Sequence, residues 1–221
     1  MKPLGIGIVG TGNIAGGYAR DILTHPEIRL VAAMDLDPVR AADFAATHGC
    51  RAHASLDELL ADDAVDVVVN LTVHHAHVEV SRRALEAGRH VYSEKPMALH
   101  AAEARALVAL AAERGLRLGC SPATFLGEAQ QTAAAWIRDS RLGTVRAIYA
   151  DVSWGRIETW HPSPGAFFDV GVMVDVAVYP LTLATSMVGP ARTVRACNPS
   201  KALGWSRASA LQFSRGKKMG L

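Results

Sequence analysis

Residues 4–15 read Leu-Gly-Ile-Gly-Ile-Val-Gly-Thr-Gly-Asn-Ile-Ala, and this stretch decides the fold. The apolar run Leu4–Val9 predicts a buried strand, and the pattern after it predicts a helix that begins near Gly12. A Gly-x-Gly-x-x-Ala turn joins the two. Its first glycine, Gly10, permits a tight turn, the second lets the backbone approach a pyrophosphate, and the alanine allows close helix packing. A strand, this turn and a helix in this order predict a dinucleotide-binding Rossmann domain.

The first 120 residues continue this alternation of short apolar runs with helical patterns, as βαβ units do. Further strands are expected at 29–34, 66–71, 90–92 and 116–120, and helices at 37–48, 55–58, 76–88 and 100–114. Proline in the first turn of the 37–48 helix and glycine just past its end favour that assignment, and Ser55-x-x-Glu58 is a capping-box pattern. We therefore expect the α/β class, with an open, doubly wound parallel sheet and helices on both faces.

Beyond Ser121-Pro122 the alternation stops. Helices are expected at 127–139 and 170–187, strands at 144–153 and 191–197, and an aromatic, proline-rich loop at 155–168. Segregated helices and strands are typical of an α+β domain. We expect an NAD(P)-binding Rossmann domain over 1–121, a partial α+β domain for substrate binding or oligomerisation over 122–197, and a basic, poorly ordered tail over 198–221.

Composition narrows the class of protein. The net charge of 23 − 21 = +2 gives no general attraction to nucleic acid or to a membrane surface. Cys50, Cys120 and Cys197 are odd in number and far apart, which is typical of thiols in a reducing compartment. No apolar run has membrane-spanning length, and the first strand begins too early to leave room for a signal peptide. We expect a cytoplasmic protein without nucleic-acid or membrane partners.

Asp35 falls at the end of the second predicted strand, 23 residues after Gly12. A carboxylate at that place can accept hydrogen bonds from both ribose hydroxyls and would repel a 2′-phosphate. This position favours NAD as the cofactor, with NADP as the alternative. A purely structural role, in which Asp35 caps the next helix beside Asp37, stays open.

Several segments resemble the Gfo/Idh/MocA oxidoreductases, the relatives of glucose–fructose oxidoreductase and inositol dehydrogenase. In the first half these are residues 7–15, Asn70-Leu71-Thr72 with His77, and above all Glu94-Lys95-Pro96. In the second half they are residues 122–127, Trp160-His161-Pro162, and residues 171–175 with Tyr179. The resemblance covers residues 4–197, and its most specific part is the pair formed by Glu-Lys-Pro and the later Asp-x-x-x-Tyr.

The resemblance implies an NAD(P)-dependent dehydrogenase that transfers hydride between a nicotinamide and a secondary hydroxyl of a sugar, cyclitol or similar polyol. It implies that Lys95 lies near the nicotinamide and the substrate hydroxyl, that Asp175 orients the substrate, and that Tyr179 exchanges the proton. Oxidation of an alcohol needs such a base while the hydride leaves. Asp175 and Tyr179 are four residues apart, so on one helix they would share a face.

The candidate site residues follow from the motif and the resemblance together. The residues expected to bind the cofactor are Gly10, Gly12, Asn13, Ile14, Asp35, Thr72, His77, Glu94 and Lys95. Trp160 and His161 are expected to line the substrate pocket, although an aromatic–proline loop can also simply pack over the sheet. His74, His75 and His77 lie close enough to suggest a metal site, but no cysteine or carboxylate stands at the usual spacing, so no metal is expected.

After Cys197 the resemblance ends, whereas the second domain of the family continues with further strands. We therefore expect an incomplete, C-terminally truncated second domain. Two other functions stay open: a cofactor-binding protein without turnover, or an NAD-dependent glycosidase-type member of the family. The expected partner is a small polyol or sugar, and the chain could form a homo-oligomer through its second domain.

Overall fold

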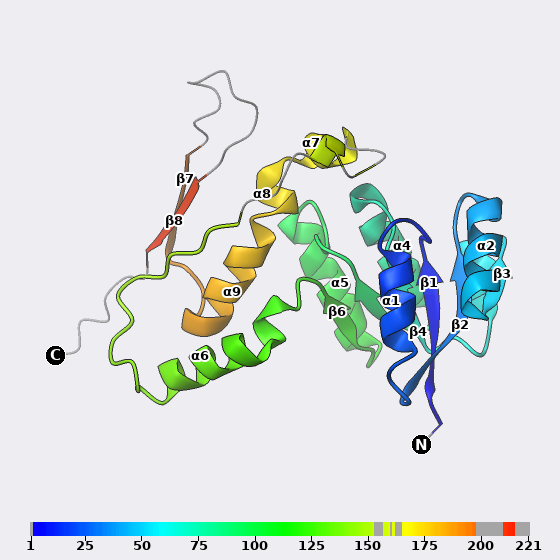
Figure 1. Cartoon of the computed structure of the whole chain (residues 1–221), viewed down its shortest axis with the longest axis horizontal. Coiled ribbons are helices and arrows are strands. Elements are labelled where there is room, and N and C mark those ends of the chain that lie inside the picture. Colours follow the sequence, from blue (N-terminus) through cyan, green and yellow to red (C-terminus); the bar gives the residue numbers. More distant parts are fainter. Residues whose placement is uncertain (1, 153–156, 160, 162–164, 198–209, 215–221) are drawn as a thin grey trace. The chain divides into compact units, whose positions relative to one another are not determined.

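The computed structural model describes residues 2–152, 157–159, 161, 165–197 and 210–214. The chain divides into two compact units, Met1–Ser121 and Pro122–Leu221 (Figure 1).

The first unit is built on a six-stranded parallel sheet in the order β3-β2-β1-β4-β5-β6. Its strands are β1 (Leu4–Val9), β2 (Ile28–Met34), β3 (Arg51–His53), β4 (Val67–Asn70), β5 (His90–Ser93) and β6 (Leu118–Cys120). The direction of winding reverses between β1 and β4, which opens a crevice at the carboxyl ends of these strands. The predicted doubly wound Rossmann sheet is confirmed. Of these six strands only β3 was not predicted, because three residues are too few to show the alternation of apolar and polar side chains that marks a strand.

Helices cover both faces of this sheet (Figure 1). One core joins the sheet to α1 (Ala15–Ile22) and α2 (Pro38–His48), and the other joins it to α3 (Leu56–Ala61), α4 (His77–Glu86) and α5 (Ala101–Glu113). Ala15 and Ala19 of α1 are fully buried, and their small side chains let that helix lie close to the strands. The glycine turn therefore delivers α1 tightly onto the sheet.

Local sequence explains where these helices begin and end. The Asp37 carboxylate accepts hydrogen bonds from the amides of Val39 and Arg40 at 3.0 and 3.2 Å and so caps α2. Gly49, with φ of 70°, ends that helix in the left-handed region. Ser55 caps α3 by accepting from the Glu58 amide at 3.2 Å. The predicted start and end signals of α2 and the predicted cap of α3 are confirmed.

The described residues of the second unit form helices and one antiparallel strand pair. Its helices are η2 (Thr124–Leu126), α6 (Glu128–Arg138), η3 (Ile157–Thr159), α7 (Gly165–Val170), α8 (Val172–Asp175) and α9 (Val178–Val188). Strand β7 (Thr193–Cys197) pairs with β8 (Ala210–Ser214). The helix predicted at 127–139 and the strand predicted at 191–197 are confirmed.

The single helix predicted over 170–187 is wrong. Three helices replace it, with breaks at Gly171 and at residues 176–177. Gly171 has φ of 76°, a conformation that ends α7. Pro180 has no N–H to donate to the carbonyl four residues earlier, so it is accommodated only in the first turn of a new helix, α9.

Two further expectations for this unit differ from the structure. Residues 144–152 form neither helix nor strand, and within the described ranges no strand pairs with them. An alternating pattern needs such a partner for its backbone groups. The predicted 155–168 loop includes η3 and the start of α7. Within 198–221, for which a poorly ordered tail is expected, the structure describes only β8, which pairs with β7, and the other residues lie outside the described ranges.

No helix in the described part of the chain is both long enough and apolar enough to cross a membrane.

Candidate functional site: a nucleotide crevice at the edge of the sheet

The turn after β1 requires glycine at position 10. Gly10 has φ of 94°, and a Cβ atom there would lie 2.8 Å from the backbone carbon and oxygen of Leu71. Its amide donates to the Met34 carbonyl at 2.8 Å. The turn is therefore wedged between the ends of β2 and β4, where only a residue without a side chain fits.

Gly12 has a different reason to be glycine. A Cβ atom at this exposed position would meet no described atom within 4 Å, so the fold itself has room for a side chain. Asn13 and Ile14 follow in the turn, and no side chain in the described structure caps α1 at Ile14. The amides of Ala15 and Gly17 donate to the carbonyls of Gly12 and Ile14 at 3.1 and 3.0 Å, and the positive end of the helix dipole, without a side-chain cap, attracts anions. Glycine at 12 keeps that space clear for a phosphate group.

Asp35 lies just after β2, at the carboxyl edge of the sheet where the crevice opens, and is almost completely buried. Its Oδ2 accepts from the Thr11 amide at 2.7 Å and from the Thr11 hydroxyl at 3.1 Å. Its Oδ1 accepts from the Asp37 amide at 3.0 Å and from Arg40 Nη2 at 2.7 Å. Burial alone would raise the pKa of Asp35, but these hydrogen bonds and the guanidinium charge lower it to about 2. Asp35 is therefore an ionised carboxylate that ties the glycine turn to the start of α2.

Thr72 and His77 are held by one buried hydrogen-bond network after β4. The Asn70 amide nitrogen donates to the His77 carbonyl at 3.0 Å, and the Thr72 hydroxyl donates to Asn70 Oδ1 at 2.7 Å. The His77 ring, 1% exposed, places Nδ1 2.7 Å from the Pro96 carbonyl and Nε2 2.9 Å from the Thr72 carbonyl. This ring joins the loop after β4 to the loop after β5.

Glu94 and Lys95 follow β5 at the same edge. Glu94 Oε1 accepts from the Tyr18 hydroxyl at 2.5 Å and the Ser121 hydroxyl at 3.3 Å, and Oε2 accepts from the Lys95 amide at 2.9 Å. Burial and the neighbouring Glu94 carboxylate raise the pKa of Tyr18, so its hydroxyl stays a donor. The Glu94 carboxylate thus links three segments of the chain, namely α1 through Tyr18, the residue after β6 through Ser121, and the backbone at Lys95. These contacts fix the position of Lys95.

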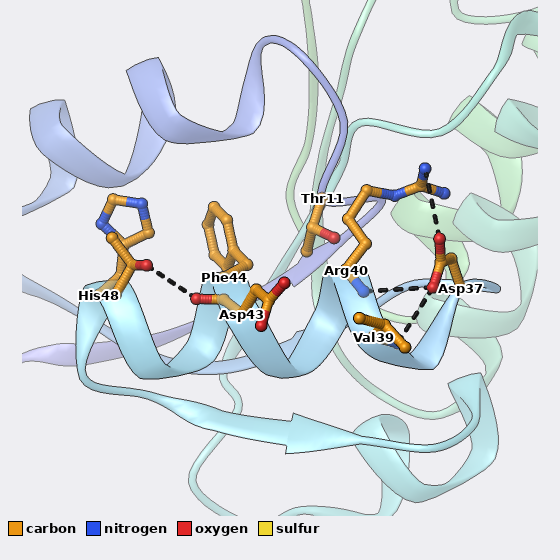
Figure 2. A pocket seen from close by; sticks show the side chains of 8 residues that line it. Thr11, Asp37, Val39, Arg40, Asp43, Phe44 and His48 are labelled. Atoms are coloured by element: carbon orange, nitrogen blue, oxygen red, sulfur yellow. Dashed lines mark hydrogen bonds and ion pairs between the residues drawn. The ribbon is translucent and has the colours of Figure 1, made fainter.

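An open pocket of about 400 Å³ adjoins this crevice along α2 (Figure 2). Its lining is formed by Thr11, Asp37, Val39, Arg40, Asp43, Phe44, Thr47 and His48. Figure 2 shows Arg40 at the end of the pocket near Thr11, with its guanidinium directed toward Asp37. Thr11, the second residue of the turn that begins at Gly10, therefore also lines this pocket.

The other predicted residues lie in the second unit. Asp175, 6% exposed, ends α8, and Tyr179 lies in the first turn of α9, so the two are not on one continuous helix as predicted. The His161 ring packs edge-on against Phe167, with centroids 4.6 Å apart. Trp160 lies outside the described residues.

The structure brings the nine predicted cofactor-binding residues to the carboxyl edge of one sheet. It also adds residues that the predicted site did not include, of which Thr11 and Asn70 belong to the motifs quoted above and Tyr18, Arg40 and Ser121 do not. The only signal for Arg40 was its place one helical turn after the Asp37 cap. Tyr18 and Ser121 carried no signal, because their partner Glu94 is distant in sequence from both.

Other chemistry finds little support in the described residues. Cys50 and Cys120 are free thiols, and burial raises the pKa of Cys120 to about 12, which keeps it protonated and unreactive. No group of three or more histidine, cysteine or carboxylate side chains is arranged there to hold a metal ion. The His77 ring nitrogens, which suggested a ligand, both lie against backbone carbonyls.

Together the sheet order, the glycine turn and the carboxylate after β2 define a dinucleotide-binding protein of the Rossmann class. The model of the Gfo/Idh/MocA family, an oxidoreductase family with an NAD-binding Rossmann fold, matches residues 4–121. The chain belongs to this family, and the sequence-based resemblance is confirmed.

Three similar proteins illustrate the relationship. The dTDP-3,4-didehydro-2,6-dideoxy-alpha-D-glucose 3-reductase of Streptomyces antibioticus is 35% identical over 197 residues, covering 85% of this chain and 57% of that protein. The UDP-N-acetylglucosamine 3-dehydrogenase of Acidithiobacillus ferrooxidans is 32% identical over 184 residues, covering 83% and 54%. The WlbA dehydrogenase from Bordetella pertussis, crystallised with NADH and UDP-GlcNAcA, is 26% identical with a TM-score of 0.83, covering 90% of this chain and 61% of that one. The chain thus spans little more than half the length of the curated relatives it matches.

Proposed function

We propose that this chain is an NAD(P)-dependent oxidoreductase that transfers hydride between a nicotinamide and a secondary hydroxyl of a sugar, cyclitol or similar polyol. The observation that carries the proposal is the open space in front of α1 at Gly12, flanked by the ionised Asp35 and by Lys95 at the same sheet edge. A pyrophosphate fits that space because the backbone at Gly12 and the positive end of α1 border it without a side chain in the way. Two of the relatives named above are, by name, a 3-reductase and a 3-dehydrogenase of nucleotide-linked sugars, which favours such substrates.

The residues of the first unit match the parts of a dinucleotide. The turn from Gly10 to Ile14 would hold the pyrophosphate, and Asp35 the adenosine ribose. Leu36 and Val73 are 93% and 62% exposed, and apolar surface of this kind suits the adenine ring. The bound nicotinamide would supply the hydride acceptor or donor.

The remaining residues would handle the substrate. Lys95 carries a positive charge at the crevice and would bind the hydroxyl that loses or gains hydride. Asp175 would orient that hydroxyl, and Tyr179 would take or return its proton. His161, and Trp160 beside it in the sequence, would contact the substrate. The family resemblance supports these roles.

Cofactor binding is tested by calorimetric titration with NADH and a pair of alanine variants. Gly12→Ala places a methyl group in the open space, and we expect NADH affinity to fall by at least about 10-fold while the melting temperature stays within a few degrees of wild type. Gly17→Ala is the matched control, because a Cβ there also meets no described atom within 4 Å but lies inside α1. Unchanged NADH binding in Gly12→Ala would place the cofactor elsewhere.

Turnover is tested by NADH formation from free polyols and nucleotide-linked sugars. In Lys95→Met and Tyr179→Phe we expect kcat to fall by about 10²-fold or more, because the first variant removes the charge proposed to bind the reacting hydroxyl and the second removes the group proposed to exchange its proton. NADH affinity should change little in Tyr179→Phe. Full turnover in that variant would remove Tyr179 from the proton step.

A further inference from the structure

Hydroxyl groups from three separate places in the chain gather at the Glu94 carboxylate. Tyr18 belongs to α1, Tyr92 to β5, and Ser121 follows β6 directly. The Tyr18 and Ser121 hydroxyls donate to Glu94 Oε1 at 2.5 and 3.3 Å, and the Tyr92 hydroxyl lies 2.9 Å from Ser121 Oγ. The other carboxylate oxygen accepts from the Lys95 amide at 2.9 Å. The contacts thus form one series that ends at the backbone of Lys95.

The direction of this series follows from the number of protons. A hydroxyl has one proton to donate, and Ser121 donates its proton to Glu94. The contact between Tyr92 and Ser121 is then a hydrogen bond in which Tyr92 is the donor. Tyr92 therefore orients the Ser121 hydroxyl, and the Ser121 hydroxyl orients the carboxylate. Hydrogen bonds in such a series polarise and strengthen one another.

The backbone holds Tyr92 and Ser121 in place for these contacts. Strands β5 and β6 pair in parallel, and the Ser121 amide donates to the Ser93 carbonyl at 3.0 Å. A Cβ atom at Gly119, which pairs with Tyr92, would lie 3.0 Å from Tyr92 Cδ2, so glycine at 119 leaves room for the tyrosine ring. Tyr92→Phe therefore keeps the ring in its place and removes only the hydroxyl.

We propose that Ser121 is a positioning residue for Lys95 and that Tyr92 acts through it: the Tyr92 hydroxyl orients that of Ser121, which holds the Glu94 carboxylate against the Lys95 amide. This inference rests on the proposed function, in which Lys95 binds the reacting hydroxyl. Neither Tyr92 nor Ser121 is among the residues proposed to bind cofactor or substrate. Ser121 is also the last residue of the first unit, so its hydroxyl fastens the end of that unit to the segment that carries Lys95.

The first test is a double-variant cycle on kcat in the whole chain, using free polyols and nucleotide-linked sugars. In Ser121→Ala we expect kcat to fall by about 10-fold, the low end for loss of a hydrogen bond to a charged group. In Tyr92→Phe it should fall by about 3-fold, because that bond joins two neutral groups. The double variant should match Ser121→Ala at about 10-fold, whereas independent effects would multiply to about 30-fold. The dissociation constant for NADH should change by less than about 3-fold in all three, because the phosphate site at Gly12 keeps its geometry.

The second test needs no substrate. Amide hydrogen exchange, measured by NMR on the whole chain, reports how firmly the Lys95 amide is held. In Ser121→Ala we expect exchange at Lys95 to accelerate by about 10-fold, and by more than at Leu71. The Leu71 amide donates to the Val9 carbonyl at 2.8 Å in the same unit and therefore reports the stability of the unit as a whole.

Ser140→Ala and Tyr149→Phe are the matched controls, because both residues are exposed, and each should leave kcat and exchange at Lys95 unchanged. Equal acceleration at Lys95 and Leu71 in Ser121→Ala overturns the inference and gives Ser121 a purely structural role. Unchanged kcat in a Ser121→Ala chain that turns over substrate also overturns it, and a multiplicative double variant overturns the dependence of Tyr92 on Ser121. If wild type turns over no substrate but Ser121→Ala accelerates exchange at Lys95 alone, the proposed function fails while the positioning of Lys95 by Ser121 is supported.

Discussion

Tyr18 connects α1 to the Glu-Lys-Pro segment through a single hydroxyl. Its hydrogen bond of 2.5 Å to Glu94 holds the carboxylate that in turn accepts the Lys95 amide. Tyr18→Phe removes only the oxygen. We expect the loss of this charge-assisted bond to cost about 1.5–3 kcal/mol of stability and to lower kcat by about 10-fold through a misplaced Lys95.

The measurement that separates positioning from bulk stability is the split between kcat and the affinity for NADH. Tyr18→Phe should lower kcat by more than it weakens NADH binding, because it displaces Lys95 while the proposed phosphate site at Gly12 keeps its geometry. Tyr149→Phe, at a tyrosine that is 95% exposed, serves as the control and should match wild type. A Tyr18→Phe enzyme with unchanged kcat would limit Tyr18 to a structural role.

Asp35 also makes stability depend on pH. Its pKa in the folded chain is lowered to about 2, below the value of about 3.9 for an unfolded aspartate. The stabilisation is therefore fully present above about pH 4 and is lost as pH falls toward 2. Because Arg40 is half-exposed and solvent screens the pair, we expect a contribution of about 1–2 kcal/mol.

Urea unfolding of wild type and Asp35→Asn at pH 6 and at pH 2.5 measures this contribution. The difference in unfolding free energy between the two proteins should shrink at the lower pH, because there the carboxylate is protonated in the unfolded chain but still mostly ionised in the folded one, so that unfolding takes up a proton. Asp63→Asn, which changes a fully exposed carboxylate, is the control. A difference that is the same at both pH values would mean that Asp35 titrates normally.

At the scale of elements, His77 is the link between the loops after β4 and β5. Both of its ring nitrogens contact backbone carbonyls, and the ring is buried. His77→Leu keeps a similar volume but leaves the Thr72 and Pro96 carbonyls without this donor. We expect a loss of about 2–4 kcal/mol in unfolding free energy, with weaker NADH binding because Thr72 and Lys95 shift together. His75→Leu, at an exposed position in η1 (His74–Ala76), should change neither quantity.

The first unit was largely predictable because its signals are local. The glycine spacing, the valine-rich run of β4 and the caps of α2 each depend on a few neighbouring residues. The same is not true of the contacts inside the site. Glu94 meets Tyr18 across 76 positions of sequence, and that contact exists only because the sheet order places β5 near α1.

The second unit shows where local reasoning stops. The apolar composition of 170–187 correctly indicated helix, but it hid two breaks. Gly171 and Pro180 were visible signals for them and were outweighed by hydrophobicity. The alternation at 144–153 was a true pattern without a partner strand among the described residues. An alternating pattern of apolar residues shows that a segment can form a strand, but the strand forms only where a second strand pairs with it.

At the scale of the whole molecule, the division at Ser121 places all the residues proposed to bind the cofactor in the first unit, and two of the residues proposed for turnover, Asp175 and Tyr179, in the second. Both hydrophobic cores of the first unit consist of residues that precede Ser121, and the predicted cofactor residues all lie there as well. We therefore expect residues 1–121 to fold alone, with one cooperative urea transition, and to bind NADH within about 3-fold of the whole chain. Ser121 must be kept, because it donates to Glu94.

The same fragment should be unable to turn over substrate, because Asp175 and Tyr179 belong to the second unit. Circular dichroism, NADH titration and a polyol oxidation assay on the fragment and the whole chain test both halves of this expectation. A folded fragment that binds NADH and shows no turnover assigns chemistry to the second unit. A fragment that oxidises substrate as fast as the whole chain would instead place the entire reaction in the Rossmann unit, with Lys95 as its proton-handling group.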